Sequence, residues 1–304
     1  MMSMGKKGVL LMGYGSPGSL DGIEEYFTSI RRGKVPSAEE VEELARRYRA
    51  IGGISPLANI TSSQARLLQA KLTSNGSDTK VYVGMKHSRP FVKEVVMSMK
   101  NDGIEEMLCL PLAPFYSRIG TETYFDAVKE AAPGEDIGAQ YVKSWNDEPG
   151  LIGCWSGKIG KAAAGFGSED FRLVFSAHSL PVTDLDDLET YRSQLGHTAG
   201  LVARQSGVDS WDLAFQSAGM REGKWIGPSI YERLEERRLG GEHRFLIAPI
   251  GFISDNLETL YDAGIRCREW AGKNAVRAIT AEAPNDSEGL IMALHSVVKR
   301  HGFA

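Results

Sequence analysis

Residues 173–181 read LVFSAHSLP, and residues 9–17 read VLLMGYGSP. Each stretch is a short run of apolar, strand-forming residues that ends at a larger polar side chain, His178 or Tyr14, with a proline three residues later. Such runs predict buried strands of a parallel sheet, each followed by a loop at its carboxyl end. Because the two stretches line up residue by residue, they also indicate an internal duplication.

A second pair of segments supports the duplication. LAPFYSRIGTETY at 112–124 lines up with IAPIGFISDNLETLY at 247–261, which pairs Glu122 with Glu258 after a small gap. Two matches in the same order along the chain favour two similar halves. The halves would join near 144–150, SWNDEPG, where Asp-Glu-Pro-Gly interrupts the chain.

Apolar runs alternate with longer amphipathic ones along the rest of the chain. This alternation is typical of βα units that build parallel sheets. The expected strands lie near 8–14, 80–86, 105–112, 139–145, 172–178, 211–217, 244–250 and 275–281. The expected helices lie at 38–50, 61–73, 90–101, 119–131, 149–164, 186–205, 228–238, 256–270 and 286–301. We therefore expect an α/β fold with four strands in each half.

The composition is that of an ordinary globular protein, with 304 residues, 42% of them hydrophobic and 24% charged, and a net charge of −4. This length gives room for two domains with cores of their own. Charges of one sign form no long run, so no general nucleic-acid-binding surface is expected. The first apolar run lacks a cleavage-type site and no segment approaches a membrane span, so we expect neither a signal peptide nor an integral membrane segment.

The three cysteines, Cys109, Cys154 and Cys267, lie far apart and form no CxxC pair. This spacing favours neither a disulfide framework nor a zinc or iron–sulfur site. We expect the protein to be cytoplasmic.

Ligands of open parallel sheets bind at the carboxyl ends of the strands, where the loops lie. We expect the residues there to line a cleft between the two halves. They are rich in His, Tyr, Ser and carboxylate side chains, namely Tyr14, Lys86, His87, 114–117, His178, Ser179, Gln216, Ser217 and 249–258.

His178 ends its strand within Ser-Ala-His-Ser-Leu-Pro. A neutral imidazole can accept a proton or bind a divalent transition metal near pH 7. A half-buried histidine bonded to the backbone is the structural alternative, and the residues alone leave both open. A Ser-His-Asp hydrolase is disfavoured, because no GxSxG nucleophile elbow follows a strand.

Glu258 lies in Ser-Asp-Asn-Leu-Glu, where a helix is expected to begin. With Asp255 as the N-cap residue it would complete a capping box, and a catalytic carboxylate is the alternative. Asp262 and Arg266 follow at four-residue steps, so the three side chains should share one helix face. A solvated ladder of ion pairs explains that stripe equally well.

Tyr14 stands between two glycines, which let a ligand approach the backbone closely. Farther on, Arg31, Arg32, Arg46, Arg47 and Arg49 could hold carboxylates through forked hydrogen bonds. The glutamates among them allow another interpretation, a helix stabilised by its own ion pairs. Gly52 and Gly53 mark a turn that could serve as a lid.

Taken together, these segments resemble the ferrochelatase family over nearly the whole chain. FSAHSLP and DNLETLYD are the most specific blocks, and the spacing between blocks fits as well. The blocks are IRRG (30–33), RYRAIGGISPLANIT (47–61), KHSRPF (86–91), LAPFYS (112–117), FSAHSLP (175–181), WIGP (225–228) and SDNLETLYD (254–262).

The resemblance implies two flavodoxin-like domains, 1–143 and 144–285, with the C-terminal helix 286–304 packed back on the first. It implies iron insertion into a porphyrin, with His178 and Glu258 as catalytic and metal-binding residues. A tyrosine at the end of the first strand is typical of the coproporphyrin III branch, where it faces the metal, so Tyr14 favours that substrate. The resemblance also assigns substrate-binding roles to Tyr14, Arg31, Arg47, Tyr48, Ser55 and Tyr124.

The sequence departs from some relatives at two points. Arg266 stands where they carry an acid, which weakens the case for Asp262 as part of an outer metal site or proton path. The cysteines that bind an iron–sulfur cluster in certain members have no counterpart here, so no cluster and no permanently bound cofactor are expected. Ferrous iron and a porphyrin are the expected substrates, and transient haem-pathway proteins are the expected partners.

Three other functions stay open at this point. A protoporphyrin IX ferrochelatase typically has methionine in place of Tyr14. A cobalt or nickel chelatase for sirohydrochlorin typically relies on paired histidines. A non-catalytic tetrapyrrole-binding protein would need neither His178 nor Glu258.

Overall fold

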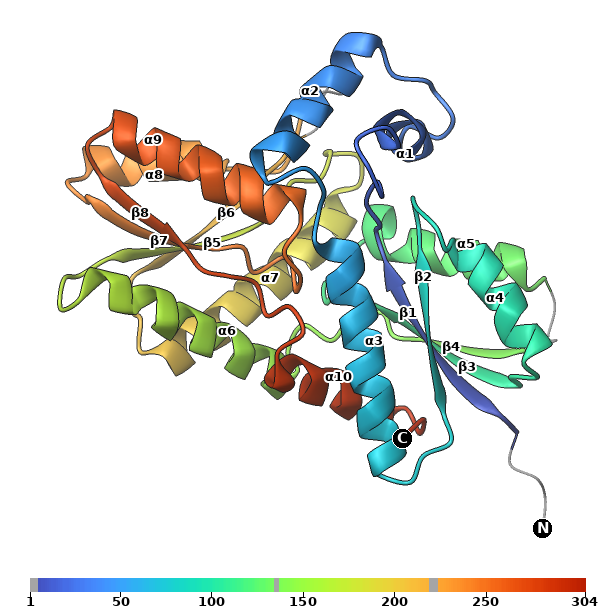
Figure 1. Cartoon of the computed structure of the whole chain (residues 1–304). Helices are drawn as coiled ribbons and strands as arrows, with labels where there is room; N and C mark the ends of the chain where they lie inside the picture. Colours follow the sequence, from blue (N-terminus) through green and yellow to red (C-terminus); the bar gives the residue numbers. More distant parts are fainter. Residues whose placement is uncertain (1–4, 134–136, 219–223) are drawn as a thin grey trace. The chain divides into compact units, whose positions relative to one another are not determined.

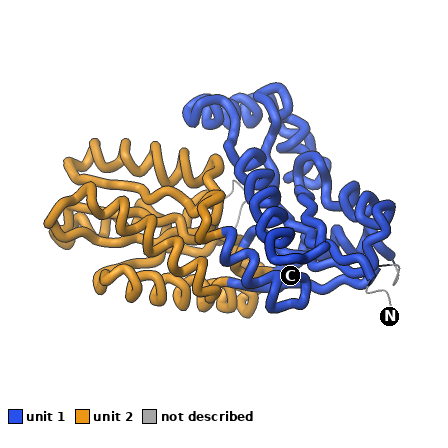
Figure 2. The backbone as a smooth tube through the Cα atoms, turned by 60° about the horizontal axis from the view of Figure 1, so that its bottom comes forward, with its two compact units in different colours: residues 1–113, 118–145, 291–304 blue, residues 114–117, 146–290 orange. Residues whose placement is uncertain are grey.

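The computed structural model describes residues 5–133, 137–218 and 224–304. Two compact units are distinguished by colour in Figure 2. Unit 1 holds the described residues of 1–113, 118–145 and 291–304, and unit 2 holds those of 114–117 and 146–290. The sequence placed the boundary between residues 143 and 144 and showed no sign that 114–117 belongs with the second unit. The cleft expected between the two units stays a prediction.

Unit 1 is built on a parallel sheet with the strand order β2-β1-β3-β4, which flavodoxin-like folds share. Helices α4 and α5 cover one face through an apolar cluster, and α3 lies on the other face (Figure 1). The strands are β1 Lys7–Gly13, β2 Lys80–Met85, β3 Glu106–Pro111 and β4 Gly138–Tyr141. The helices are α1 Ile23–Ile30, α2 Ala38–Ala50, α3 Leu57–Ser74, α4 Val92–Asn101, the π-helical η1 Arg118–Glu122 and α5 Thr123–Ala131.

Unit 2 repeats this plan with the strand order β6-β5-β7-β8, as a duplication would produce. Its strands are β5 Arg172–His178, β6 Trp211–Gln216, β7 Arg244–Ala248 and β8 Arg277–Thr280. Its helices are α6 Pro149–Ala163, the 3₁₀ turn η2 Ala164–Phe166, α7 Leu185–Ser206, α8 Ile230–Leu239, the π-helical η3 Glu258–Arg266 and α9 Cys267–Lys273. The last helix, α10 Glu288–Arg300, begins in unit 2, and its residues from Ile291 belong to unit 1.

Short-range signals explain many of the element boundaries. Ser37 and Glu40 form a complete capping box at the start of α2, and Ser229 does the same for α8 with its own glutamate. Gly207 ends α7 with a φ of 67°, a left-handed conformation that glycine adopts without steric cost. In each sheet the first strand is central and has neighbours on both edges, so the β1 side chains from Val9 to Met12 are fully buried.

All eight expected strands are confirmed, with differences at their ends. The largest is in β4, which ends at Tyr141 rather than at residue 145. Helix α1 was missed because it has only eight residues and no side-chain cap. The segments expected as helices at 119–131 and 256–270 contain π-helical turns, which leave no clear signature in residue periodicity.

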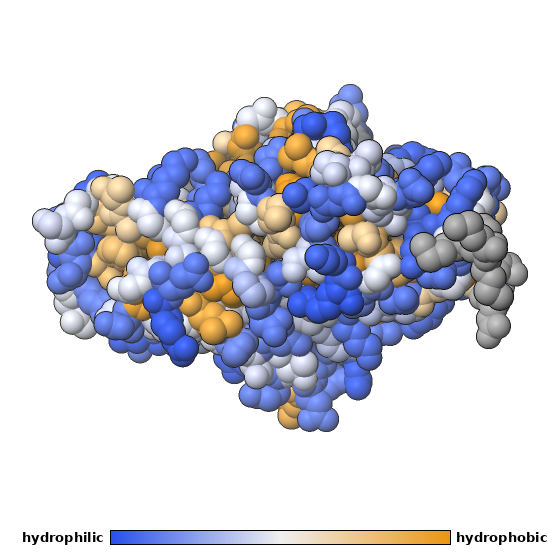
Figure 3. Space-filling view, turned by 90° about the horizontal axis from the view of Figure 1, so that it is seen from below, coloured by the Kyte–Doolittle hydropathy of each residue, from blue (hydrophilic) through white to orange (hydrophobic). Residues whose placement is uncertain are grey.

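The face of the molecule seen in Figure 3 is mostly hydrophilic, with apolar residues in small groups between polar ones. Among the described helices, none combines the length and the apolar character that a membrane crossing requires.

Candidate functional site

His178 is the last residue of β5, and its backbone is fixed on both sides. It pairs in register with Gln216 of β6, and its carbonyl accepts a hydrogen bond from the Tyr191 hydroxyl at 3.2 Å. The next residue, Ser179, donates its N–H to the Gln216 carbonyl at 2.8 Å. The strand before it is fully buried from Leu173 to Ala177. The imidazole therefore projects from a rigid strand end, although its own side chain is 40% exposed.

Nδ1 of His178 lies 2.8 Å from Oε2 of Glu258, in the first turn of η3. An ionised carboxylate only accepts hydrogen bonds, so Nδ1 is the donor in this pair. In neutral His178 the lone pair is then on Nε2, which is free to accept a proton or bind a metal ion. The pair thus brings together the two residues to which the resemblance assigned catalysis.

The surroundings of His178 favour its protonated form. Burial is the largest single influence on its pKa and lowers it. The charge of Glu258, the hydrogen bond from Nδ1 and the charge of Asp262 together outweigh burial and raise the pKa above its ordinary value of 6.5. A base of this kind takes up a proton readily near neutral pH.

The capping box that the sequence allowed between Asp255 and Glu258 does not form. The Asp255 N–H donates to Asn285 Oδ1, and Asn256 Oδ1 accepts the N–H groups of Glu258 and Thr259. Thr259 Oγ1 in turn accepts the Asn256 N–H at 2.9 Å, which completes a box one residue later than expected. Glu258 therefore stands one residue before the position that closes the box, and its carboxylate is directed to His178.

Asp262 is 5% exposed and lies one turn beyond Glu258 in η3. Its Oδ2 accepts the hydroxyl of Ser217 at 2.6 Å, and its carbonyl accepts the Tyr231 hydroxyl. Its Oδ1 also lies 3.9 Å from Nη1 of Arg266, so part of the expected ladder of ion pairs is present. Ser217 holds a positive φ of 57°, an uncommon conformation for a residue other than glycine.

Unit 1 gathers a second group of polar side chains at the carboxyl ends of β1 and β2. Tyr14 is 43% exposed, and its ring makes an edge contact with His87 at a centroid distance of 4.7 Å. Lys86 Nζ lies 5.9 Å from the Tyr14 ring centroid and 5.6 Å from that of Tyr124, and it donates to Thr123 Oγ1 at 2.6 Å. Tyr14 and Tyr124, two predicted porphyrin contacts, are thus linked through one lysine.

Burial weakens the basicity of both residues that follow β2. It is the main cause that lowers the pKa of Lys86 to about 8, and the positive charge of Arg32 adds to it. Burial and the neighbouring Lys86 lower the pKa of His87 to about 4. His87 is therefore neutral at physiological pH, and Ser29 Oγ lies 3.1 Å from its Nδ1.

The other predicted porphyrin contacts lie in α2 and the segments beside it. Arg31 follows α1 and its Nη1 donates to Oε2 of Glu40 at 2.5 Å. Arg47 and Tyr48 are in the last turn of α2, and Tyr48 is only 2% exposed. Ser55 is 5% exposed and its Oγ accepts the N–H of Leu57 at the start of α3. Their roles toward a porphyrin stay predictions.

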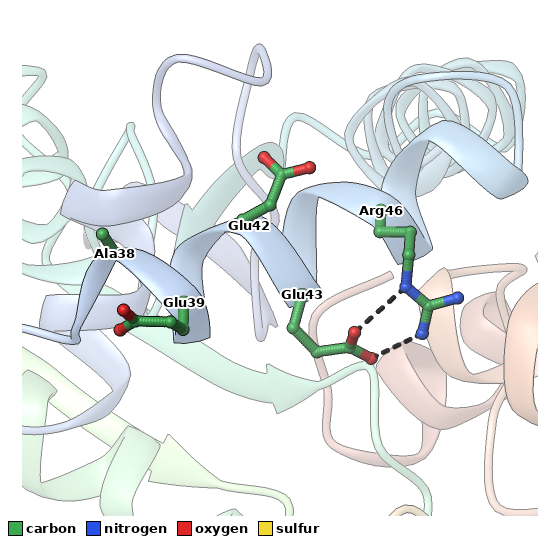
Figure 4. A pocket seen from close by; sticks show the side chains of 5 residues that line it. All are labelled: Ala38, Glu39, Glu42, Glu43 and Arg46. Carbon is green, nitrogen blue, oxygen red and sulfur yellow. Dashed lines mark hydrogen bonds and ion pairs between the residues drawn. The ribbon is translucent and has the colours of Figure 1, made fainter.

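A pocket of about 450 Å³ lies on α2 (Figure 4). Its lining contains none of the residues to which the resemblance assigned a role, although Arg46 is one of the arginines that the sequence offered for carboxylate binding. The two nitrogens Nε and Nη2 of Arg46 donate to the Glu43 carboxylate, an exposed pair typical of a solvated helix face. The lining residues are Ala38, Glu39, Glu42, Glu43 and Arg46.

Lys86 and Ser217 contact the predicted site residues, but the sequence assigned no role to either of them. Both follow strands, which is the signal that marked them, and Lys86 also opens the block KHSRPF. Their partners, Thr123 and Asp262, are distant in sequence, so only the folded chain reveals the contacts. Among the described residues, no group of three or more His, Cys, Asp or Glu side chains is arranged to hold a metal ion.

Solved structures of low sequence identity share the fold. The sirohydrochlorin chelatase SirB of Bacillus subtilis subspecies spizizenii, in complex with cobalt, matches with a TM-score of 0.54 and 10% identity over 98% of both chains. SirB from Bacillus subtilis with Fe³⁺ matches with a TM-score of 0.58 and 11% identity, again over 98% of both chains. At these identities the comparison shows the two-sheet α/β fold alone.

Comparison of sequences identifies the family as well as the fold. Coproporphyrin III ferrochelatase of Geobacillus sp. (strain WCH70) is 37% identical over 98% of both chains. Coproporphyrin III ferrochelatase 1 of Bacillus anthracis is 37% identical over 96% of both chains. The sequence model of the family described as Ferrochelatase matches residues 6–302. Nearly the whole chain is thus covered by one family, and this protein belongs to the ferrochelatases.

Proposed function

We propose that this protein is a lyase that inserts Fe(II) into coproporphyrin III to give its iron complex in haem biosynthesis. The observation that carries the proposal is the hydrogen bond between His178 and Glu258 at the carboxyl end of β5. Family membership and the names of relatives at 36–38% identity support the reaction and the substrate.

Metal insertion exchanges two pyrrole N–H protons for one Fe²⁺ ion, so the site must remove two protons from the ring nitrogens. Nε2 of neutral His178 can accept a proton, while the Glu258 carboxylate stabilises the imidazolium that results. Nε2 and a Glu258 oxygen are also suitable donors for a divalent transition metal. The two roles of His178 cannot operate at the same instant, because Nε2 has one lone pair.

The choice of coproporphyrin rests on Tyr14 and on the cationic side chains of unit 1. Coproporphyrin carries four propionates, whereas protoporphyrin carries two propionates and two vinyl groups. Arg31 and Arg47 can form charge-assisted bonds with propionates, and an arginine that faces a vinyl group loses that bond. The Tyr14 hydroxyl can approach an inserted iron, which the thioether of methionine would bind only weakly.

The proposed cofactors, place of action and partners are those expected from the sequence. No permanently bound cofactor and no iron–sulfur cluster are proposed, and iron is the substrate. The cysteines Cys109, Cys154 and Cys267 are free thiols, which suits the reducing cytoplasm proposed as the place of action. Transient partners among other haem-pathway proteins are also proposed.

The decisive experiment measures anaerobic Fe(II) insertion side by side with coproporphyrin III and protoporphyrin IX. We expect the higher kcat/KM with coproporphyrin III. Equal or greater kcat/KM with protoporphyrin IX would place the protein in the other branch of the family. Porphyrin binding without any turnover would instead indicate a tetrapyrrole carrier.

A further inference from the structure

The guanidinium of Arg31 is held from two sides. Its Nη1 donates to Oε2 of Glu40 at 2.5 Å, and its central carbon lies 5.5 Å from the centroid of the Phe27 ring. Phe27 comes from α1 and Glu40 from the first turn of α2, so side chains of two helices fix this arginine. A long flexible side chain fixed in this way loses less entropy when it later binds a ligand.

Glu40 is fixed in turn by the backbone. Its Oε2 also accepts the Ser37 N–H at 2.8 Å, while Ser37 Oγ accepts the Glu40 N–H at 3.3 Å. The Ser37 N–H, and after it Arg31, hold the pKa of Glu40 below its ordinary range. Glu40 is therefore ionised at neutral pH, and its position is set by the capping box of α2.

The bond to Glu40 leaves part of the Arg31 fork open. Within residues 5–133, 137–218 and 224–304, the guanidinium donates to Glu40 alone, and it does so through Nη1. A guanidinium binds a carboxylate through two parallel N–H bonds along one edge, and the edge of Nε and Nη2 remains for that purpose. The side chain of Arg31 is 22% exposed, so a ligand can reach it.

We propose that Glu40 is a positioning residue that presents Arg31 to a propionate of the porphyrin. This role rests on the proposed function, because it takes a carboxylate-bearing porphyrin as the ligand. Glu40 acts through Arg31, whose guanidinium it keeps in one place before the substrate arrives. Preorganisation of this kind strengthens binding of the substrate without a part in the metal insertion step. A Glu40 that competed with the substrate for Arg31 would have the opposite effect.

The variants Glu40→Ala and Glu40→Gln separate positioning from competition. Alanine removes the acceptor, whereas glutamine keeps an oxygen for Arg31 and also serves in a capping box. We expect Glu40→Ala to raise the KM for coproporphyrin III about 3- to 10-fold, while kcat stays within about twofold of the wild type. This increase corresponds to the loss of part of the binding free energy of one charge-assisted hydrogen bond. Glu40→Gln should stay within about twofold of the wild type. Fluorescence titration of metal-free coproporphyrin III should show binding weakened by the same factor in Glu40→Ala.

Two controls on the same helix exclude a general effect on its stability. Ser37→Ala removes the capping hydroxyl but leaves the bond between Arg31 and Glu40, and Glu43→Ala removes the exposed ion pair with Arg46. Both controls should keep the wild-type KM for coproporphyrin III. A KM raised equally by Ser37→Ala would reduce Glu40 to a capping residue and overturn the proposal.

Two further results would also overturn it. A lower KM in both Glu40 variants would show competition, and an unchanged KM in Glu40→Ala would show that Arg31 needs no positioning. Both leave the ferrochelatase activity standing. A wild-type protein that fails to metallate coproporphyrin III would refute the proposed function instead.

Discussion

Glu258→Gln tests whether the carboxylate beside His178 takes part in the reaction or only supports the fold. Glutamine is nearly isosteric and its oxygen can still accept the hydrogen bond from His178 Nδ1, so the variant removes the charge alone. Without that charge, two of the influences that raise the pKa of His178 are weakened, and burial, which lowers it, gains weight. The pKa of His178 should therefore fall in the variant.

The cost to stability should be small. The side chains of His178 and Glu258 are 40% and 28% exposed, and a pair screened by solvent in this way contributes about 0.2–1 kcal/mol. Because the folded pKa of His178 is raised, this contribution is fully present below pH 6.5 and is lost as pH rises through the folded pKa. Wild type and variant should thus differ in thermal stability at pH 6, and the difference should shrink as the pH rises above the folded pKa of His178.

The cost to activity should be much larger. Loss of an acid–base group lowers a rate by about 10²-fold, which corresponds to about 2.7 kcal/mol of activation free energy. This is several times the expected change in stability, so the two effects can be told apart. If neutral His178 is the active base, the acidic limb of the pH profile of kcat/KM should also move to lower pH, because the pKa of His178 falls.

The assay is anaerobic Fe(II) insertion into coproporphyrin III, followed by absorbance from pH 5.5 to 9, with thermal unfolding of the same samples. Glu122→Gln is the control, because Glu122 is the counterpart of Glu258 in the other half of the chain and pairs with exposed Lys129. The control should keep its activity. Near-normal turnover by Glu258→Gln, or a loss no larger than its unfolded fraction explains, would refute the catalytic role.

Three further variants probe other parts of the molecule. His178→Ala should lower metal insertion by about 10²-fold or more, and near-normal turnover in a folded sample would exclude it as the base. Arg31→Ala should raise the KM for coproporphyrin III more than that for protoporphyrin IX, with kcat little changed; equal effects on both porphyrins would remove Arg31 from substrate selection. Asp212→Ala should lower the free energy of unfolding of the protein by about 2–3 kcal/mol in a urea titration, because Arg172, Arg233 and Arg237 lose the counter-charge that they share. The 8%-exposed carboxylate of Asp212 accepts two bonds from Arg237, 2.8 and 2.6 Å long. Glu235→Ala, which removes an exposed partner of Arg238, should change little, and equal losses in the two variants would contradict this ranking.

The fold class could be derived from the sequence because its signals are local. Buried strands such as LVFSAH at 173–178 are continuous apolar runs, and capping residues such as Ser37 act within one turn of a helix. The duplicated order of strands and loops predicted two similar sheets. Helix α1 was missed because eight residues without a side-chain cap carry too weak a local signal. His178 and Glu258 could also be singled out, because each stands in a block, FSAHSLP or SDNLETLYD, that is specific to the family that the chain resembles.

What Glu258 does, by contrast, depended on the tertiary structure. The sequence allowed a capping box with Asp255, but Asn285 takes the Asp255 N–H and Thr259 closes the box with Asn256, so the Glu258 carboxylate reaches His178. The pair of Arg31 and Glu40 and the contact of Lys86 with Thr123 were likewise revealed only by the tertiary structure. A side chain with several possible partners bonds the one that the packed backbone brings within about 3 Å, and that distance is set by the whole unit rather than by neighbours in the chain.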